Sequence, residues 1–492
     1  MGEASEGSLH HGCGFPLPSP PPIWGRGFGW SLSNAMATLC LALTVASAAW
    51  PSHARADDPT CDYDVTVLDS HAAKLDISVA CDPALSVSKF TALGNRDHWW
   101  TDPNGYKDGK GRFTYDLGAF AKSEDDMGSA MPFGGGVLVT PGFLLPLPDT
   151  QRAAMLRFRF KFAAGGTLLT ALRADPDGYY QVPLLRLDEA GPLILGEVKG
   201  QPIPGDPELT LAVPPGALKI APEQIDAWVS AVAESNRRFW ARSPTKGGLV
   251  VLVPSPRDGV PFGRVLSLGG AVLTVLVGKD ATPRQLYDDW VLVHEFIHLG
   301  SPLMRDTGAW LNEGFATFYE PVLRTRAGWK SEDEVWREWI SSMPRGMPAM
   351  TDIGLENAGR GGIYWGGALF VLMAEIESLK ASNGKIGFSD CLRTVLAEGG
   401  EVTVKWPTMK FLDRCDALLG KPVIGQLARQ HIEKGSAMDL DQLWKRLGVS
   451  MADGGAIRYD DTAELAWLRP LIIWGGTTHP APISANGFYS GD

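Results

Sequence analysis

Two histidines and a glutamate lie in an apolar stretch, VLVHEFIHLG, at a spacing that suits metal-dependent hydrolysis. In a helix, residues four apart lie about 40° apart around the axis, so His294 and His298 point to the same side. Their neutral ring nitrogens could bind one Zn²⁺ together. Glu295 would then lie close to the ion without facing it, where it could accept a proton from a water that the ion activates. The stretch therefore predicts a zinc site with a general base beside it.

A catalytic zinc usually has three protein ligands and one position for water. The stretch DTGAWLNEGFATFYEP supplies Glu313, and fourteen residues separate it from His298. A second helix that runs back past the first would bring this carboxylate to the ion, so we expect one Zn²⁺ bound by both histidines and Glu313. Glu320, two turns further on, could hydrogen-bond a ligand histidine and hold its ring, and Asn312 could do the same.

The alternative for this stretch is a pair of ordinary core histidines beside a buried Glu295. An unpaired buried carboxylate is costly unless it stays protonated, which favours the metal site.

The surrounding sequence divides into four parts. Residues 1–56 predict a disordered leader and a signal peptide, since the apolar segment MATLCLALTVASAAW is followed by the small-x-small pattern Ala54-Arg55-Ala56. Residues 57–215 predict a β-rich domain, with alternating strands such as MLRFRFKF. Residues 216–470 predict the catalytic domain, α/β to about residue 300 and helical after it, and 471–492 a C-terminal tail.

Within the catalytic part, the patterns predict a helix at 221–243, strands at 249–254 and 269–278, and a helix at 282–300 that carries the two histidines. The fold class we expect is α+β. A β-sandwich-like N-terminal domain comes first, and the catalytic domain ends in a mostly helical C-terminal lobe.

Four cysteines follow the signal segment and predict two disulfides. If 61–67 and 75–81 pair as antiparallel strands about His71, Cys61 lies opposite Cys81. Cys391 and Cys415 lie on two consecutive helical patterns and could link them. The alternative is two pairs of buried free thiols. Two disulfides suit an exported protein, periplasmic or secreted.

The charge balance argues against one class of partner. A formal net charge of −11 does not suit nucleic acid, which binds basic surfaces. After the signal segment we expect no stable membrane span. The expected partner is a peptide or protein substrate, and the sequence does not determine the oligomeric state.

The phrases HEFIH and WLNEGFATFYE resemble the gluzincin zinc metallopeptidases, above all the glycyl aminopeptidase and aminopeptidase N families. The resemblance covers residues 220–400 and implies a thermolysin-like catalytic domain and a zinc peptidase. These families also have a Tyr-x-Lys-Gly motif whose tyrosine donates to the oxyanion. The stretch YWGGALF matches it at Tyr364 and Gly367, with Gly366 in place of the lysine.

The resemblance also concerns the strand that holds the substrate. In aminopeptidase N relatives an edge strand begins Gly-x-Met-Glu-Asn, and its glutamate holds the free amino terminus. Here the stretch GGAVLTV implies substrate contacts at Gly269, Gly270 and Ala271, with Val272 where the acid belongs. Valine cannot bind an ammonium group, so aminopeptidase specificity is not implied.

The sequence thus favours a zinc peptidase in which Glu295 is the general base and Tyr364 the oxyanion donor. Three alternatives stay open. They are a zinc hydrolase of esters or non-peptide amides, an inactive peptidase-like binding protein of the cell envelope, and a protein in which zinc is only structural.

Overall fold

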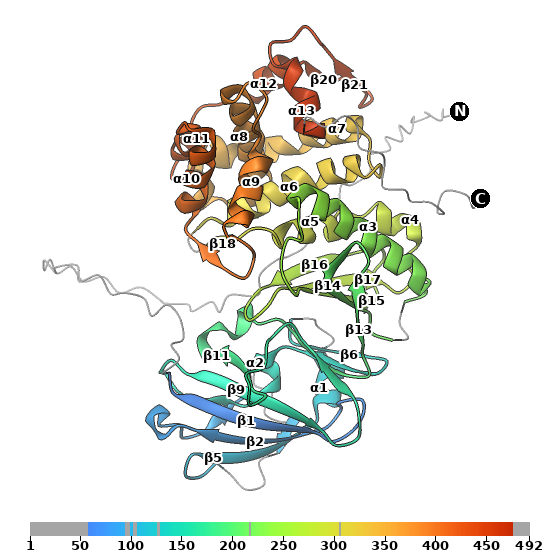
Figure 1. The fold of residues 1–492 in the computed structure, drawn as a ribbon, viewed down its shortest axis with the longest axis vertical. Coiled ribbons are helices and arrows are strands. Elements are labelled where there is room, and N and C mark those ends of the chain that lie inside the picture. Colours follow the sequence, from blue (N-terminus) through green and yellow to red (C-terminus); the bar gives the residue numbers. More distant parts are fainter. Residues whose placement is uncertain are drawn as a thin grey trace, which may run out of the picture. The chain divides into compact units, whose positions relative to one another are not determined.

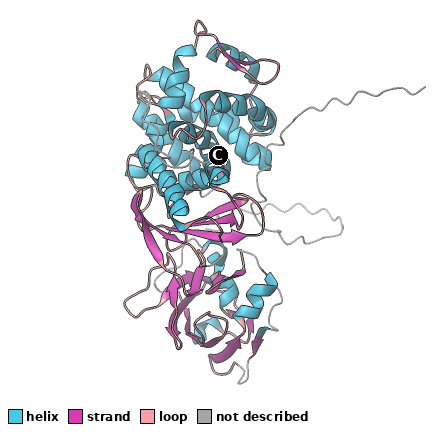
Figure 2. Ribbon diagram, turned by 90° about the vertical axis from the view of Figure 1, so that its right-hand side faces the viewer, coloured by secondary structure: helices cyan, strands magenta, loops and turns pink. Residues whose placement is uncertain are grey.

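The computed structural model describes residues 58–93, 99–101, 106–124, 128–215, 218–304 and 307–475. Strands dominate the first part of this range and helices the last part (Figures 1 and 2). The predicted leader and signal peptide, and residues 476–492 of the predicted tail, lie outside the described residues.

Two sheets build the N-terminal part. The larger has the strand order β11-β9-β1-β2-β5-β4 and the smaller the order β10-β12-β7-β6. Val65 and Phe158 of the larger sheet share one buried core with Val137 and Leu195 of the smaller. The strands are β1 Thr60–Val67, β2 Leu75–Cys81, β4 Trp100–Thr101, β5 Lys110–Tyr115, β6 Ala130–Phe133, β7 Gly136–Val139, β9 Met155–Phe162, β10 Thr167–Leu169, β11 Tyr180–Pro183 and β12 Leu193–Gly196.

Short elements complete this part: the helices α1 Leu117–Glu124 and α2 Pro141–Leu144, and the paired strands β3 Phe90–Thr91 and β8 Leu147–Pro148. The prediction of a β-sandwich-like N-terminal domain in an α+β chain is confirmed.

The first hairpin has the predicted register. Cys61 lies opposite Cys81, and Val65 lies opposite Ile77. Alternate residues of β1 are buried, so a shift by one residue would turn the apolar side chains toward solvent. The register brings the two sulfur atoms together, and the predicted Cys61–Cys81 disulfide is present.

A five-stranded sheet carries the catalytic part, in the order β13-β14-β15-β17-β16. Its strands are β13 Gly200–Ile203, β14 Asp206–Ala212, β15 Leu249–Ser255, β16 Phe262–Leu266 and β17 Val272–Gly278. β14, β15 and β17 are parallel, and the outer strands β13 and β16 are antiparallel to their neighbours. Two strands of this sheet thus come before the predicted boundary at residue 215; the division into domains stays a prediction.

The helices that follow are mostly longer than the strands. They are α3 Pro222–Trp240, α4 Pro283–Tyr287, α5 Val291–His298, α6 Ala309–Arg326, α7 Glu332–Ser342, α8 Gly367–Ala381, α9 Phe388–Ala397, α10 Thr408–Leu419, α11 Val423–His431, α12 Leu440–Leu447 and α13 Arg469–Trp474. Two short sheets lie among them, made of β18 Leu303–Met304 with β19 Lys405–Trp406, and β20 Val449–Met451 with β21 Ile457–Tyr459.

The helix predicted at 282–300 is two helices, α4 and α5. The carboxylate of Asp289 accepts a hydrogen bond from the backbone N–H of Leu292 at 3.1 Å. An aspartate that satisfies such an N–H starts a new helix, so the chain turns before the histidine stretch.

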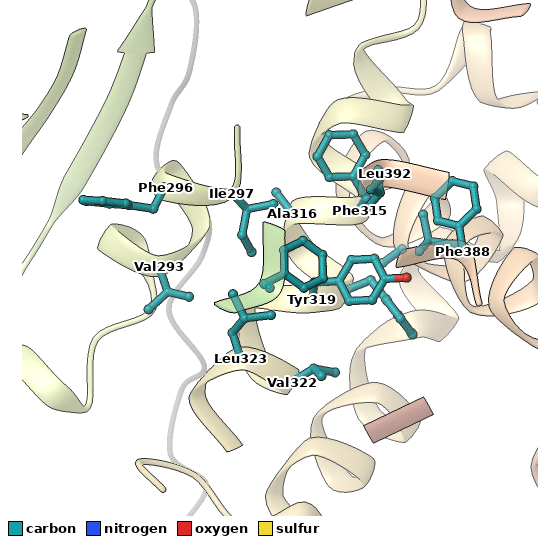
Figure 3. Close-up of a cluster of buried hydrophobic side chains, with 14 of the residues drawn as sticks. Val293, Phe296, Ile297, Phe315, Ala316, Tyr319, Val322, Leu323, Phe388 and Leu392 are labelled. Carbon is teal, nitrogen blue, oxygen red and sulfur yellow. The ribbon is translucent and has the colours of Figure 1, made fainter. Parts of the chain in front are cut away.

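Buried side chains hold α5 against α6. Phe296 and Ile297 of α5 and Phe315 and Leu323 of α6 belong to one core, and Figure 3 shows α9 contributing Phe388 and Leu392 to the same cluster. All are at most 1% exposed. This packing fixes the two helices that carry the predicted metal ligands.

The helical lobe contains the second predicted disulfide, Cys391–Cys415, between α9 and α10. Two disulfides indicate an oxidising, exported compartment. One described helix, Gly362–Ala381, is long and apolar enough to cross a membrane, but 72% of its most apolar 18-residue window is buried inside the protein, as in a core helix.

Candidate active site

The predicted zinc ligands come together where α5 meets α6. Nε2 of His294 lies 3.2 Å from Nε2 of His298 and 3.2 Å from Oε2 of Glu313, and Nε2 of His298 lies 3.6 Å from the same oxygen. His294 is 2% exposed. One helix supplies both imidazoles and the next supplies the carboxylate, as the sequence predicted.

These three atoms fit a tetrahedral zinc ion. Two ligand atoms at about 2.0–2.1 Å from Zn²⁺ lie about 3.3 Å apart in tetrahedral geometry, close to the three separations above. The three contacts are not all ordinary hydrogen bonds at once, since Nε2 of His294 cannot both donate a proton to Glu313 and accept one from His298. The donor set of two imidazoles and one carboxylate is that of a catalytic zinc.

Electrostatics keep Glu313 ionised. Burial opposes its charge, but the two imidazoles beside it outweigh burial and hold the pKa of this carboxyl well below its usual range. Burial also lowers the pKa of His294, although its hydrogen bond to Glu313 acts in the other direction. On His298 burial also lowers the pKa, but Glu313 and Glu295 outweigh it and raise the pKa of that imidazole. Both rings must be neutral to bind a metal cation.

Glu295 lies in a different environment although it is the next residue. It is 6% exposed, and burial raises the pKa of its carboxyl to about 7. The charges of His298 and Arg264 act against that rise. A carboxyl poised near neutral pH can both accept and return a proton.

Tyr364 comes to the same cluster from the helical lobe. It lies in the π-helical turn Gly362–Gly366, its ring is 6.1 Å from that of His294, and its phenol interacts electrostatically with Glu313 and Glu295. Burial and the two nearby glutamates raise the pKa of this phenol, so it carries its proton. The fold thus brings Tyr364, which matches the tyrosine of the Tyr-x-Lys-Gly motif, close to the candidate ligands.

Gly366, where the motif has lysine, is buried. A Cβ at this position would lie 3.0 Å from Cβ of Ala349, and a Cβ on Gly346 would overlap the backbone of Trp365 and Gly366. This close approach of two backbone segments leaves no room for a longer side chain.

Asn312 and Glu320, the two residues predicted to hydrogen-bond the ligand histidines, have other partners. Asn312 braces the turn after α5: its Nδ2 donates to Oγ of Ser301 and to the carbonyl of Pro302, and its Oδ1 accepts from the N–H of Met304. Glu320 forms a buried ion pair with Arg324 at 3.1 Å.

The prediction that Glu320 bonds a ligand histidine is therefore corrected. Nδ1 of His294 is buried without a hydrogen-bond partner among the described residues. Seven residues of α-helix advance about 10 Å along the axis, so Glu320 lies too far from the cluster that contains Glu313.

The segment predicted to hold the substrate, 269–271, does not lie on an edge strand of the sheet. Gly269 and Gly270 lie in the turn before β17, and a Cβ there would overlap Leu172 and Ala171 of the N-terminal part. Ala271 is buried just before β17, which lies inside the sheet. The edge strand is β16, whose Gly263 touches the catalytic helix: a Cβ on it would lie 2.6 Å from Cγ of Glu295.

The sequence analysis did not identify Gly263 and Arg264 because it placed the edge strand of the sheet at 269–278 instead of at 262–266. A usable signal was present: FGRVL alternates weakly and is followed by the turn SLGG, so it forms a hairpin with the next strand. Arg264 also donates from Nη2 to the carbonyl of Asp188 at 3.2 Å, a contact from far away in the chain.

No protein-family model matches the sequence, and a comparison with curated proteins gives no match. Among solved structures, an aminopeptidase N family protein from Idiomarina loihiensis is similar with a TM-score of 0.54 and 12% identity over 79% of this chain and 78% of that one. An M1 zinc metallopeptidase from Deinococcus radiodurans gives a TM-score of 0.42 and 14% identity over 78% and 95%. Yeast LTA4 hydrolase gives 0.43 and 13% over 78% and 68%. The chain therefore has a gluzincin aminopeptidase-like fold, that of the aminopeptidase N family protein.

Proposed function

We propose that the chain is a zinc-dependent peptidase of the HExxH…E type. The observation that carries the proposal is the convergence of His294, His298 and Glu313 at tetrahedral spacing, with Glu295 on the next position of the same helix. One Zn²⁺ would be held by these three side chains and would lower the pKa of a water in its fourth position to about 7, which supplies the nucleophile.

In this proposal Glu295 transfers the proton and Tyr364 stabilises the oxyanion. Glu295 accepts the proton of the attacking water and returns it to the departing amine. Tyr364 donates its phenolic hydrogen to the oxygen that becomes negatively charged at the cleaved carbonyl.

The backbone of β16 supplies a place for the peptide. An edge strand can pair with an extended peptide, and the contact between Gly263 and Glu295 puts such a peptide beside the general base. The two disulfides support an exported, periplasmic or secreted enzyme, and we assign residues 1–56 to a leader and a signal peptide.

The test uses the purified protein with and without a chelator. We expect one zinc per chain by metal analysis, and cleavage of a peptide mixture that chelator abolishes and added zinc restores. Glu295→Gln should keep the zinc and lose cleavage by at least about 10²-fold. Peptides that survive equally in both conditions would refute the proposal.

Ester and small-amide substrates belong in the same assay. Turnover of these with peptides untouched would favour the alternative of a non-peptide hydrolase. Peptide binding that is unchanged in Glu295→Gln, without turnover in the native chain, would favour an inactive binding protein.

A further inference from the structure

A side chain from α6 holds the turn that leads into α5. Nη2 of Arg324 donates to the carbonyl oxygen of Asp288 at 2.9 Å and to that of Tyr287 at 3.4 Å. Tyr287 is the last residue of α4 and Asp288 its C-cap, positions whose carbonyls have no partner within their own helix. The donors of a guanidinium lie in one rigid plane, so one side chain can serve both carbonyls. Arg324 therefore links α6 to the turn between α4 and α5.

Arg324 is itself held in place by a neighbour on α6. Its Nη1 donates to Oε1 of Glu320, one turn earlier, at 3.1 Å. Both residues are buried, with Arg324 7% and Glu320 4% exposed. Breaking such a pair is costly, because the remaining partner becomes an unpaired buried charge. The pair thus keeps the guanidinium directed at the turn.

Arg324 and Glu313 lie on the same side of α6. They are eleven positions apart, which corresponds to about 20° around a helix axis and about 16 Å along it. Both reach the neighbouring helix: Glu313 contacts the imidazoles, and Arg324 contacts the turn just before α5 begins. Buried Val293 of α5 and Leu323 of α6 belong to the core that the two helices share (Figure 3). α6 therefore holds α5 at two separate points.

The turn passes directly into the helix that carries the candidate ligands. Asp289 accepts a hydrogen bond from the N–H of Leu292, and the carbonyl of Trp290 accepts one from the N–H of His294 at 3.0 Å. The indole of Trp290 also lies nearly perpendicular to the His294 ring, with the ring centres 5.3 Å apart. Because α5 is eight residues long, a shift at its start reaches both imidazoles and Glu295.

We propose that Arg324 is a positioning residue of the candidate active site: it fixes the turn before α5 and so places the imidazoles and Glu295; this inference rests on the proposed peptidase function. Its role differs from that of an ion pair that only stabilises the fold. Glu320 and Arg324 by themselves link two turns of one helix, whereas the two carbonyls of the turn extend the link to α5.

The experiment uses the full-length chain with the double substitution Glu320→Met/Arg324→Met. Replacing both partners of a buried ion pair by apolar side chains often leaves stability unchanged or raises it, so this variant should fold. The carbonyls of the turn nevertheless lose their donor. We expect hydrogen exchange of the α5 amides to become about tenfold faster relative to the α8 amides. Zinc affinity should fall about tenfold, and kcat on a peptide about 10²-fold with KM little changed.

Two further variants separate positioning from stability. Arg324→Lys keeps a cation beside Glu320 but has no planar fork of donors, so it should show the same changes at smaller size, also where the double variant fails to fold. Glu234→Met/Arg238→Met is the matched control, since this pair has the same spacing and lies on α3, with 2.8 Å between its charged atoms. The control should match the native chain in exchange, zinc affinity and kcat.

Native exchange of the α5 amides in both Arg324 variants, together with native zinc affinity and kcat, would overturn the inference. So would an exchange increase that is equal in α5 and α8, because that is a loss of stability of the whole fold. A native chain that neither binds zinc nor cleaves peptides would refute the proposed function instead. The exchange of α5 relative to α8 then decides by itself whether Arg324 holds this helix.

Discussion

Gly263 of the edge strand β16 and Glu295 of the helix α5 are in direct contact. A Cβ placed on Gly263 would lie 2.6 Å from Cγ of Glu295 and 2.7 Å from a methyl group of Val291. The absence of a side chain at Gly263 therefore allows the edge strand and the helix to approach closely at Glu295, the proposed general base.

This contact predicts that Gly263→Ala lowers the rate without removing the metal. The added methyl must displace Glu295, and a shift of about 1 Å at a catalytic group can cost about 10²-fold in rate. We expect kcat on a peptide to fall by about that factor while zinc content stays at the native value. Gly359→Ala is the control, since nothing lies within 4 Å of its Cβ, and a Gly263→Ala chain with the native kcat would contradict the prediction.

The turn between α5 and α6 depends on Asn312, which makes three hydrogen bonds across it. Asn312→Ala leaves the buried hydroxyl of Ser301 and the N–H of Met304 without this partner. The free energy of unfolding should drop by about 1–3 kcal/mol, the cost of buried polar groups that lose their bonds. Urea unfolding measures the loss. Because the turn orients the helices that carry the proposed ligands, zinc affinity should also fall. Unchanged affinity together with unchanged stability would show that the turn does not depend on Asn312.

Two helices of the catalytic part meet at glycines. A Cβ on Gly367 of α8 would overlap the carbonyl oxygen of Trp310 and lie 2.7 Å from Cα of Gly314, both on α6. Gly367→Ala should therefore force the helices apart and destabilise the fold by about 1–3 kcal/mol, as overpacking does. Thermal unfolding should show the loss, whereas Gly361→Ala, with open space around its Cβ, should unfold near the native temperature.

Glu375 on α8 should make stability depend on pH. Its carboxylate accepts hydrogen bonds from the Tyr319 hydroxyl at 2.8 Å and the Phe388 N–H at 2.7 Å, yet burial raises the pKa of the group. Arg326 acts against that rise and Asp390 adds to it. The folded state thus binds a proton more tightly than the unfolded state does.

The sign follows from linkage. The stabilisation from the Glu375 proton is fully present below about pH 4.3, the ordinary glutamate value, and is lost as pH rises through the raised folded pKa. Glu375→Gln removes this titration. Urea unfolding of both chains from pH 4 to 8 should therefore show the native chain losing stability relative to the variant as pH rises, and parallel curves would refute the prediction.

Local periodicity was enough to predict much of this protein. The four-residue spacing of His294 and His298 places both rings on one side of any helix, and the alternation in 61–67 and 75–81 sets the register that brings Cys61 opposite Cys81. The resemblance added Tyr364. The helix-face and register inferences could be made because they depend on neighbours within a few turns or one hairpin, whereas Tyr364 could not be found from local periodicity.

The order of strands in a sheet is not a local property. FGRVL and GGAVLTV are both short apolar segments that follow one another in the sequence. Hydrogen bonds to β15 and β16 place β17 inside the sheet, whereas β16 pairs with β17 alone and so forms the edge beside Glu295. Distance along α6 likewise separates Glu320 from the ligands, although it shares a helix with Glu313. The sequence alone thus determined the types of the candidate ligands and the helices that carry them. The tertiary structure decided which strand and which glycine lie beside them, because that depends on packing between segments far apart in the chain.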